Sequence, residues 1–438
     1  MTLLSPGTLA ELLGASVPAD DFPTGTGVAF NSAAVAAGDV FFAFAGATSH
    51  GVDYAAQALE RGAAYLVSDR PHPRALLVPD AGQALLSLGR LARSRLEGAV
   101  IGITGTAGKT STKGMLAAAL NARSTPGNFN TPYALAQTLV HAHLAEVAAG
   151  PGAERPALVL ELGIDHPGEM QHLTDLTKPD HGMITSIGAS HLAGLGDVAG
   201  VAREKGALLR AVTGHKLVST GAAEHLSPEL LADATIVAAH VSLNGSAGSA
   251  LEAFGRHIKL PWPGRSAAEN ALLALTMATQ LGVPLDTALT RMLTAKLEGS
   301  RLQRHEVGDL TLIDDSYNSN PVSLRAALEV LFNAPAPRVA FLGDMLELGA
   351  SEAEEHRAMG AATLGLDLVV GVGPASALML DANPAARWAH DAAAAAAFLP
   401  DIPAGATVLV KGSRGIRLEK LIQHLEHRYR DSLRSEPT

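Results

Sequence analysis

The residues best suited to chemistry lie in one short glycine-rich segment, GTAGKT, at positions 105–110. An apolar run over 99–104 predicts a buried strand before it, and a helical pattern over 109–120 predicts a helix after it. In that setting glycine lets backbone N–H groups converge on phosphate oxygens, Lys109 supplies a compact positive charge, and the Thr110 hydroxyl can ligate magnesium. The segment therefore predicts a nucleotide-binding loop, with a purely structural turn as the alternative.

The elements that must position this loop belong to a large, acidic chain. Its 438 residues, at about 150 residues per domain, predict about three domains. Hydrophobic residues make up 47% and charged residues 17% of the chain, which excludes wholesale disorder. The net charge of -10 opposes binding to nucleic acid. The absence of cysteine excludes disulfides and thiolate metal sites.

Apolar periodicity divides the chain into three α/β units, at residues 1–97, 98–299 and 300–438. In the third unit strands alternate with helices, which predicts a parallel, Rossmann-like sheet. The predicted fold class is therefore α/β, with a small N-terminal domain, a central doubly wound domain that carries the phosphate loop, and a Rossmann-like C-terminal domain. The predicted strands are 40–45, 64–68, 99–104, 157–162, 183–187, 310–313, 339–342, 368–372 and 407–410. The predicted helices are 54–61, 109–120, 267–282, 322–331, 352–364 and 392–397.

No targeting or membrane segment is predicted. The N-terminal segment lacks a basic region, and Glu11 interrupts its apolar pattern. Polar residues such as His240 and Asn244 break a long uncharged stretch below what a membrane span tolerates. We therefore expect a cytoplasmic, monomeric protein that neither inserts into a membrane nor binds nucleic acid.

Four strings carry a resemblance to a known family. A strand followed by Thr-Gly-x-x-Gly-Lys-Thr, with Ile103 where the usual phosphate loop has glycine, resembles the loop of the Mur ligases and their folate-ligase relatives. The third unit contains DDSYNSNP at 314–321, LGDMLELG at 342–349 and KGSR at 411–414. Together these strings are similar to the family member that adds D-alanyl-D-alanine to the UDP-N-acetylmuramoyl tripeptide.

The resemblance implies both an architecture and an activity. The N-terminal domain would bind the UDP substrate, the central domain ATP, and the C-terminal domain would close over ATP and bind the dipeptide. The activity would be ATP-dependent amide ligation through an acyl phosphate, a cytoplasmic step of peptidoglycan precursor synthesis. ATP and two magnesium ions are the implied cofactors. The alternatives are another amide ligase of the Mur and folylpolyglutamate type, and a non-catalytic module that senses ATP.

The resemblance also implies catalytic and metal-binding residues. Glu161, at the end of a predicted strand, resembles the family's magnesium-binding glutamate, with a helix cap or a solvated charge as the alternative. His191 resembles the histidine that contacts a second metal ion, with a surface histidine as the alternative. Lys205 aligns with a lysine that the family carries as a carbamate formed from CO2, with a solvent-facing helix lysine as the alternative. The implied catalytic residues are Lys109, Glu161, His191 and Lys205, and the implied metal ligands are Thr110, Glu161, His191 and carbamylated Lys205.

For ATP, the resemblance implies contacts from the phosphate loop, from the start of a helix and from the third unit. A turn cluster rich in Asp, Ser and Asn is the alternative for the last of these. The implied ATP-binding residues are Gly105, Thr106, Ala107, Gly108, Lys109, Thr110, Ser111, Asn270, Arg301, Asp315, Tyr317 and Asn318.

For the two peptide substrates, the chain departs from the family pattern at two places. The sequence YALA at 133–136 replaces Ile-Gly-x-Pro, and Ala33 replaces the arginine that usually follows Ser32. We therefore expect the uridine and peptide contacts there to be rebuilt, and the third residue of the tripeptide stays open. The implied substrate-binding residues are Ser32, Asn128, Thr131, His166, Lys411, Ser413 and Arg414.

Overall fold

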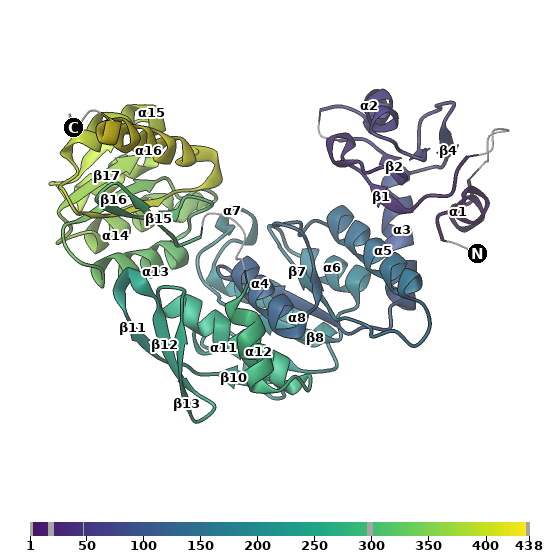
Figure 1. Cartoon of the computed structure of the whole chain (residues 1–438), viewed down its shortest axis with the longest axis horizontal. Coiled ribbons are helices and arrows are strands. Elements are labelled where there is room, and N and C mark those ends of the chain that lie inside the picture. Colours follow the sequence, from purple (N-terminus) through teal and green to yellow (C-terminus); the bar gives the residue numbers. More distant parts are fainter. Residues whose placement is uncertain (1–2, 16–21, 47, 296–300, 435–438) are drawn as a thin grey trace.

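The computed structural model describes residues 3–15, 22–46, 48–295 and 301–434. Figure 1 shows three lobes in a curved row, with the N-terminal and C-terminal lobes at its two ends. Each lobe has its own mainly parallel β-sheet, so the predicted α/β class is confirmed. The predicted boundary at 299/300 lies outside the described residues. Within the ranges described, no helix is long and apolar enough to cross a membrane.

The N-terminal lobe is a four-stranded parallel sheet in the order β1-β2-β3-β4. Its elements are β1 (Gly27–Ala29), β2 (Asp39–Ala43), β3 (Tyr65–Ser68), β4 (Ala75–Leu77), α1 (Pro6–Leu13), α2 (Ala55–Glu60), η1 (Ser32–Ala34) and η2 (Gly51–Tyr54). Successive strand residues face opposite sides, so Phe41 packs toward α2 while Val40 packs toward α3 (Ala81–Arg95) and α5 (Pro132–Ala149). The helix predicted at 54–61 is a 3-10 turn followed by a short helix.

The central lobe is a six-stranded, wholly parallel sheet in the order β10-β9-β8-β5-β7-β6. Its strands are β5 (Val100–Thr104), β6 (Arg123–Ser124), β7 (Leu158–Glu161), β8 (His181–Ile184), β9 (Lys216–Ser219) and β10 (Thr235–Val237). One face is covered by α4 (Lys109–Leu120), α11 (Arg265–Gln280) and α12 (Leu285–Leu293), and the other by α3, α5, α6 (Glu169–Thr177) and α8 (Val198–Ala211). Strand β5 is buried along its whole length and is mainly apolar without alternation, as the run over 99–104 predicted.

Two features of the central lobe differ from the sequence prediction. The strand predicted at 183–187 ends at Ile184, because Ser186 turns aside and its carbonyl accepts a hydrogen bond from the Thr106 amide (2.9 Å). An unpredicted antiparallel sheet of β11 (His240–Leu243), β12 (Ser249–Ala253) and β13 (Arg256–Leu260) packs on α11. Its strands are rich in small and polar residues, which give a weak strand signal. The remaining elements are α7 (Leu192–Leu195), α9 (Thr220–Ala223), α10 (Pro228–Leu231) and η3 (Gly245–Ala247).

The C-terminal lobe is a six-stranded sheet in the order β14-β15-β19-β16-β17-β18, in which β14 alone is antiparallel to its neighbour. Its strands are β14 (Gln303–Val307), β15 (Leu310–Asp315), β16 (Arg338–Gly343), β17 (Leu368–Val372), β18 (Arg387–Ala389) and β19 (Thr407–Lys411). Helices α13 (Pro321–Phe332) and α14 (Glu352–Ala362) cover one face, and α15 (Ala392–Ala395) and α16 (Glu419–Arg434) the other. The four strands predicted here are confirmed. The alanine-rich helix predicted at 392–397 is a single turn that continues as a 3-10 helix, η6 (Ala396–Asp401).

Side chains of α5 attach the N-terminal sheet to the central lobe. Strand β1 lies at the edge of its sheet, so its outer backbone groups lack a strand partner. Gln137 Nε2 donates to the Val28 carbonyl (2.9 Å), and the Val28 amide donates to His141 Nε2 (3.1 Å). Gln137 and His141 are four residues apart on α5 and therefore lie on one helix face, which satisfies both backbone groups of Val28.

Candidate active site

One cavity of about 740 Å³ lies between the central and C-terminal lobes. The phosphate loop and the segments after β7 and β8 line one side. The segments after β15 and β16 and the last residue of β19 line the other. Parallel sheets present their ligand-binding loops at the carboxyl ends of the strands, and here two sheets present such ends to the same space. The predicted ATP-binding and catalytic residues that line the cavity are Thr106, Ala107, Gly108, Lys109, Thr110, Ser111, Glu161, His191, Asn270, Arg301, Asp315, Tyr317 and Asn318.

The geometry of the phosphate loop depends on glycine at position 108. Gly108 has a φ of 84°, in the left-handed region, and a Cβ there would lie 2.7 Å from the Asn270 side chain. Helix α4 begins at the next residue, so its first N–H groups have no partner within the helix. Those groups and the positive end of the helix dipole lie at the cavity wall, which suits a phosphate.

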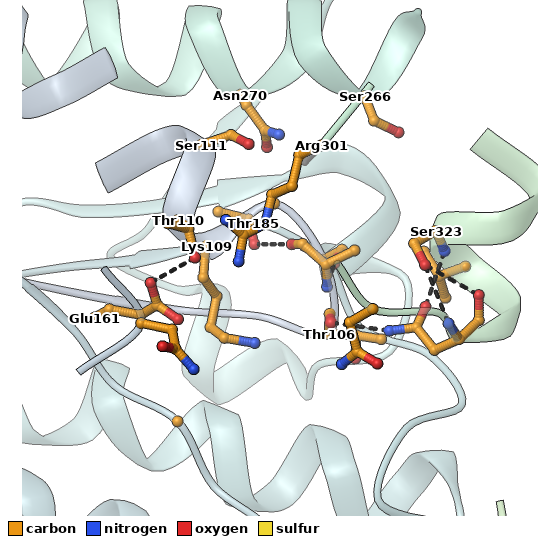
Figure 2. Close-up of a pocket in the computed structure, with 18 of the residues that line it drawn as sticks. Thr106, Lys109, Thr110, Ser111, Glu161, Thr185, Ser266, Asn270, Arg301 and Ser323 are labelled. Atoms are coloured by element: carbon orange, nitrogen blue, oxygen red, sulfur yellow. Dashed lines mark hydrogen bonds between the residues drawn. The ribbon is translucent and has the colours of Figure 1, made fainter. Parts of the chain in front are cut away.

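Lys109 and Thr110 link the loop to the carboxylate of Glu161. Lys109 Nζ donates to the Gly105 carbonyl (2.7 Å), and Thr110 Oγ1 donates to Glu161 Oε2 (2.7 Å). Figure 2 shows the side chains of Lys109 and Glu161 near each other, with Thr110 bonded to the carboxylate. Burial lowers the pKa of Lys109, Glu161 raises it, and Arg301 lowers it further. The cavity wall thus combines the lysine and the hydroxyl of the loop with the buried carboxylate at the end of β7.

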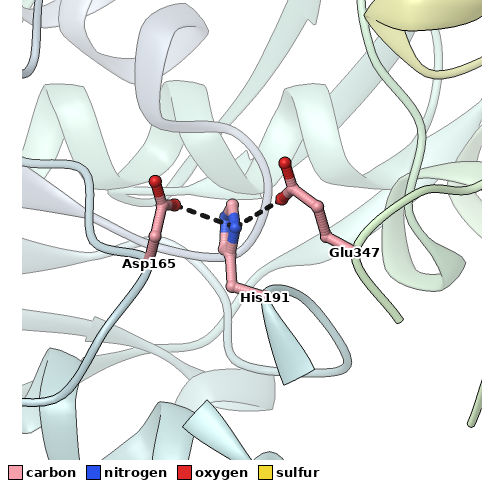
Figure 3. Close-up of side chains that lie close together, drawn as sticks. All are labelled: Asp165, His191 and Glu347. Atoms are coloured by element: carbon pink, nitrogen blue, oxygen red, sulfur yellow. Dashed lines mark ion pairs between the residues drawn. The ribbon is translucent and has the colours of Figure 1, made fainter. Parts of the chain in front are cut away.

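His191 lies between two carboxylates from different lobes (Figure 3). Its Nδ1 is 2.9 Å from Asp165 Oδ1 and 2.7 Å from Glu347 Oε2, the latter from the C-terminal lobe. Both distances are short enough for ion pairs, but neither contact has the geometry of a hydrogen bond. The buried Nδ1 atom therefore has no hydrogen-bond partner among the described residues. The contact with His191 is the main cause that lowers the pKa of Asp165.

Lys205 is buried on α8 and does not line the cavity. Burial lowers its pKa well below the ordinary value, and the neighbouring charge of Lys109 lowers it further, against Asp165 and Glu204. Glu204 is itself occupied, since it accepts from the backbone amides of residues 168 and 170. The arrangement therefore favours a neutral amine at position 205.

An amide, an aromatic ring and two guanidinium groups lie near the phosphate loop on other segments of the chain. Asn270 projects from α11 beside the loop, and Figure 2 shows Arg301 near it. The guanidinium carbon of Arg301 lies 4.0 Å from the centroid of the Tyr317 ring, and that of Arg414 lies 5.2 Å from it. Flat groups and an amide of this kind suit a nucleotide base and its phosphates.

The three strings of the C-terminal lobe meet at the carboxyl ends of β15, β19 and β16, because these parallel strands are neighbours in the sheet. Lys411 Nζ lies 2.6 Å from Asp315 Oδ2 and donates to the Asn318 carbonyl (2.8 Å). Ser413 Oγ accepts from the Leu346 amide (3.0 Å). Lys411 and Ser413 are therefore engaged inside the lobe, whereas Arg414 is exposed.

The C-terminal lobe also contacts the phosphate loop directly. Asn320, the N-cap of α13, donates from Nδ2 to the Thr106 carbonyl (3.2 Å). A second backbone contact joins the lobes, in which the Ala193 amide donates to the Glu347 carbonyl (3.4 Å). The two lobes thus meet at the phosphate loop and again in the segment that follows His191.

The predicted peptide-binding residues are spread over the chain. Asn128, Thr131 and Lys411 line the cavity, and the Thr131 hydroxyl also caps α5. His166 lies outside the cavity lining, with a side chain that is 70% exposed. Ser32 lies in the N-terminal lobe, where its hydroxyl donates to Gln57 Oε1 (2.7 Å). The structure therefore brings Asn128, Thr131 and Lys411 to the cavity wall. Ser32 and His166 do not reach it.

The residues present fit magnesium. Thr110 and the buried Glu161 supply oxygen ligands, the kind that Mg²⁺ prefers. The His191 Nδ1 atom, buried without a hydrogen-bond partner, converges with two carboxylates within 4.8 Å. Both donor sets suit a cation.

Sequence reasoning missed several residues of this site. Asp165 and Glu347 meet His191 only through folding, and Asn320 reaches the loop only across the two lobes. Lys113 was detectable, since it lies four residues after Lys109 and therefore on the same face of α4. A lysine that is buried on a helix is almost always paired, so its position beside the loop was the available signal.

Comparison with known proteins is consistent with this geometry. Residues 25–89 match the family "Mur ligase family, catalytic domain", residues 103–278 match "Mur ligase middle domain", and residues 300–414 match "Mur ligase, glutamate ligase domain". The chain therefore belongs to the Mur ligase family.

Particular relatives are similar over nearly their whole length. The UDP-N-acetylmuramoyl-tripeptide--D-alanyl-D-alanine ligase of Escherichia coli (strain K12) is 31% identical, over 95% of this chain and 96% of that protein. The enzyme of the same name from Treponema pallidum is 31% identical, over 90% of this chain and 92% of its own. A crystal structure of MurF from Acinetobacter baumannii matches with a TM-score of 0.83 and 27% identity, over 97% of this chain and 98% of that one.

Proposed function

We propose that this chain uses ATP to join D-alanyl-D-alanine to the terminal carboxylate of a UDP-N-acetylmuramoyl tripeptide. The observation that carries the proposal is the cavity in which the phosphate loop faces the three converging strings of the C-terminal lobe. The relatives named above bear the name of this activity. The reaction belongs to peptidoglycan precursor synthesis and takes place in the cytoplasm, where we place the chain as a monomer.

The first chemical step is transfer of the γ-phosphoryl group of ATP to the tripeptide carboxylate. A carboxylate resists attack by an amine because it is anionic and has a poor leaving group, whereas an acyl phosphate does not. The α4 amides and Lys109 would hold the phosphates, Asn270 and Tyr317 the nucleoside, and Arg301 the γ-phosphate. Catalysis here is mainly positioning and charge neutralisation.

Thr110 and Glu161 would hold one magnesium ion and His191 would contact a second, and carbamylation of Lys205 would add an anionic ligand. When bound, the ions neutralise charge on the phosphates. The chain's own contribution to the carbamate is a buried lysine whose pKa burial lowers well below its ordinary value, which favours the neutral amine that reacts with CO2.

In the second step the neutral dipeptide amine attacks the acyl carbon, phosphate leaves, and the proton that the amine loses passes to a carboxylate or to a phosphate oxygen of the substrate. Residues 411–414 would contribute the exposed guanidinium of Arg414 to the dipeptide, while Lys411 and Ser413 hold the surrounding segments. Asn128 and Thr131 would contact the muramyl peptide. The contact of Asn320 with the phosphate loop joins the two lobes beside the cavity, and closure of the lobes around the substrates would keep water from the acyl phosphate.

Oxygen transfer tests this proposal. With 18O in the terminal carboxylate of the tripeptide, one label per turnover should appear in inorganic phosphate, and phosphate release should require D-alanyl-D-alanine. Unlabelled phosphate, or equal release without the dipeptide, would refute the mechanism. Product formation with glutamate in place of the dipeptide would favour the alternative, a folylpolyglutamate-type ligase. A panel of tripeptides ending in lysine, ornithine or diaminopimelate, read by mass spectrometry, identifies the third residue.

A further inference from the structure

Lys113 is a fully buried cation that the proposed chemistry leaves without a role. It lies one turn beyond Lys109 on α4, and its side chain is 2% exposed. An ammonium group in such a position is costly unless polar partners replace the water that it has lost. Its partners therefore indicate what it does.

Those partners come from two parts of the site. Lys113 Nζ donates to the carbonyls of Thr125 (2.7 Å) and Gly127, at the start of the segment 125–131. The same Nζ lies 4.0 Å from Glu161 Oε2, and that carboxylate is 3% exposed. One cation thus lies between two backbone carbonyls and the carboxylate expected to bind magnesium.

Glu161 and the segment 125–131 are also bonded to each other. The Glu161 amide donates to Thr125 Oγ1 (3.2 Å), and Asn130 Nδ2 donates to Glu161 Oε1 (3.4 Å). The segment contributes Asn128, Asn130 and Thr131 to the cavity wall. Lys113 therefore lies at the centre of a network that joins the metal carboxylate to the wall expected to contact the muramyl peptide.

We propose that Lys113 is a positioning residue that holds Glu161 and the segment 125–131 in one fixed arrangement, so that metal and acceptor are aligned together. A lysine suits this task because its compact ammonium has three donors, enough for two carbonyls with a charge left close to the carboxylate. Its Nζ lies 4.0 Å from Glu161 Oε2, so its charge faces the carboxylate expected to bind the metal. The inference rests on the proposed function, since it takes residues 125–131 as an acceptor contact.

Lys113→Met tests the inference, because methionine has a similar length but neither charge nor donors. We expect the Mg²⁺ concentration for half-maximal rate and the KM for the UDP-muramyl tripeptide each to rise at least about tenfold. The KM for D-alanyl-D-alanine should stay within about twofold, because the dipeptide is assigned to the other lobe. Leu116→Ala is the matched control: it opens a cavity in the same helix away from Glu161, so it should lower Tm without changing the Mg²⁺ requirement.

A purely structural role predicts a different result. Lys113→Met would then behave like Leu116→Ala, with a lower Tm and unchanged Mg²⁺ and tripeptide dependence, and the inference would be overturned. If Lys113→Met does not fold, Lys113→Gln keeps a donor for the carbonyls but removes the charge. We expect it to retain the elevated Mg²⁺ requirement, and a wild-type requirement would refute the role of the charge.

Two measurements without turnover separate this inference from the proposed function. Binding of Mn²⁺ alone, followed by electron paramagnetic resonance, should weaken about tenfold in Lys113→Met. In a double-mutant cycle, Glu161→Gln should raise the Tm of Lys113→Met while lowering that of the wild type, because it removes a carboxylate left without its cation. If the Tm changes of the two single variants add up to that of the double variant and Mn²⁺ binding is unchanged, the inference is wrong even if the ligase assay succeeds. A wild-type chain that makes no product would instead count against the proposed function.

Discussion

His191 of the central lobe and Glu347 of the C-terminal lobe approach each other to 2.7 Å, measured from Nδ1 to Oε2 (Figure 3). Glu347 has a left-handed φ of 66°, and its carbonyl accepts from the Ala193 amide across the same interface. The string LGDMLELG, identified in the sequence only by family resemblance, thus contains a residue that touches the other lobe. Contact between the lobes and assembly of the site are therefore coupled.

Glu347→Gln should weaken the contact between the lobes. Both side chains are partly exposed, so the pair contributes about 0.2–1 kcal/mol, which changes the closed population by no more than about fivefold. We expect kcat to fall two- to fivefold and the distance between α8 and α14, measured by fluorescence energy transfer with ligands bound, to shift toward longer values. The chain has no cysteine, so two introduced cysteines give clean labelling. Glu354→Gln on exposed α14 should change neither quantity, and an unchanged distance distribution in Glu347→Gln would contradict the coupling.

Lys109→Ala should remove the charge that faces the transferred phosphoryl group. Loss of one such group costs about 10²–10³ in kcat, so phosphate release should fall by that factor. The circular dichroism spectrum should not change, because Lys109 bonds only to its own loop through Gly105 in the described structure. Lys178→Ala, at an exposed ion pair with Asp175, serves as the control. Retained turnover in Lys109→Ala would remove the proposed role.

Lys205 should carry a carbamate under the conditions of catalysis. Burial lowers its pKa well below the ordinary value, so the amine is neutral at a pH where a free lysine is charged, and only the neutral amine takes up CO2. Activity should therefore decline on the acid side as the ammonium forms, and added bicarbonate should oppose that loss. A carbamate signal from 13C-bicarbonate in the NMR spectrum checks this directly. Lys205→Ala should be inactive and partly rescued by a short-chain carboxylic acid, and the absence of both signal and rescue would count against the carbamate.

The attachment of the N-terminal lobe should depend on pH through His141. Burial lowers the pKa of His141 because it disfavours the charged ring, and nearby Asp39 opposes this shift. The ring accepts the Val28 amide through Nε2, which requires that nitrogen to be unprotonated. The folded pKa lies below the unfolded value of about 6.5, so the stabilisation is present above that pH and is lost as the pH falls through the folded pKa. Between about pH 7.5 and 5, Tm should fall more for the wild type than for His141→Gln, as measured by calorimetry. Equal pH dependence in both proteins would show that another group is responsible. At neutral pH His141→Ala should cost about 1–3 kcal/mol, because it leaves the Val28 amide unpaired.

Much of the fold follows from local patterns in the chain. The strand at 99–104, the loop and the helix at 109–120 appear in the structure almost residue for residue, because a buried parallel strand is uniformly apolar and a loop at a helix N-terminus needs glycine. Predictions were weaker where tertiary contacts override local preference. The pattern over 185–187 predicts a strand, but these residues form hydrogen bonds with the phosphate loop instead. The antiparallel sheet on α11 contains small and polar residues, whose strand conformation depends on the neighbouring strands and on α11.

By itself the sequence determined the α/β class, the phosphate loop and the types of group that could serve ATP and magnesium, because each is encoded within a few adjacent residues. Tertiary structure alone decided which distant residues meet: Glu347 with His191, Asn320 with Thr106, and Lys113 with the segment 125–131. The physical reason is that such contacts depend on strand order and on the packing of one lobe against another. Neither strand order nor the packing of the lobes is encoded by the residue spacing within a single segment.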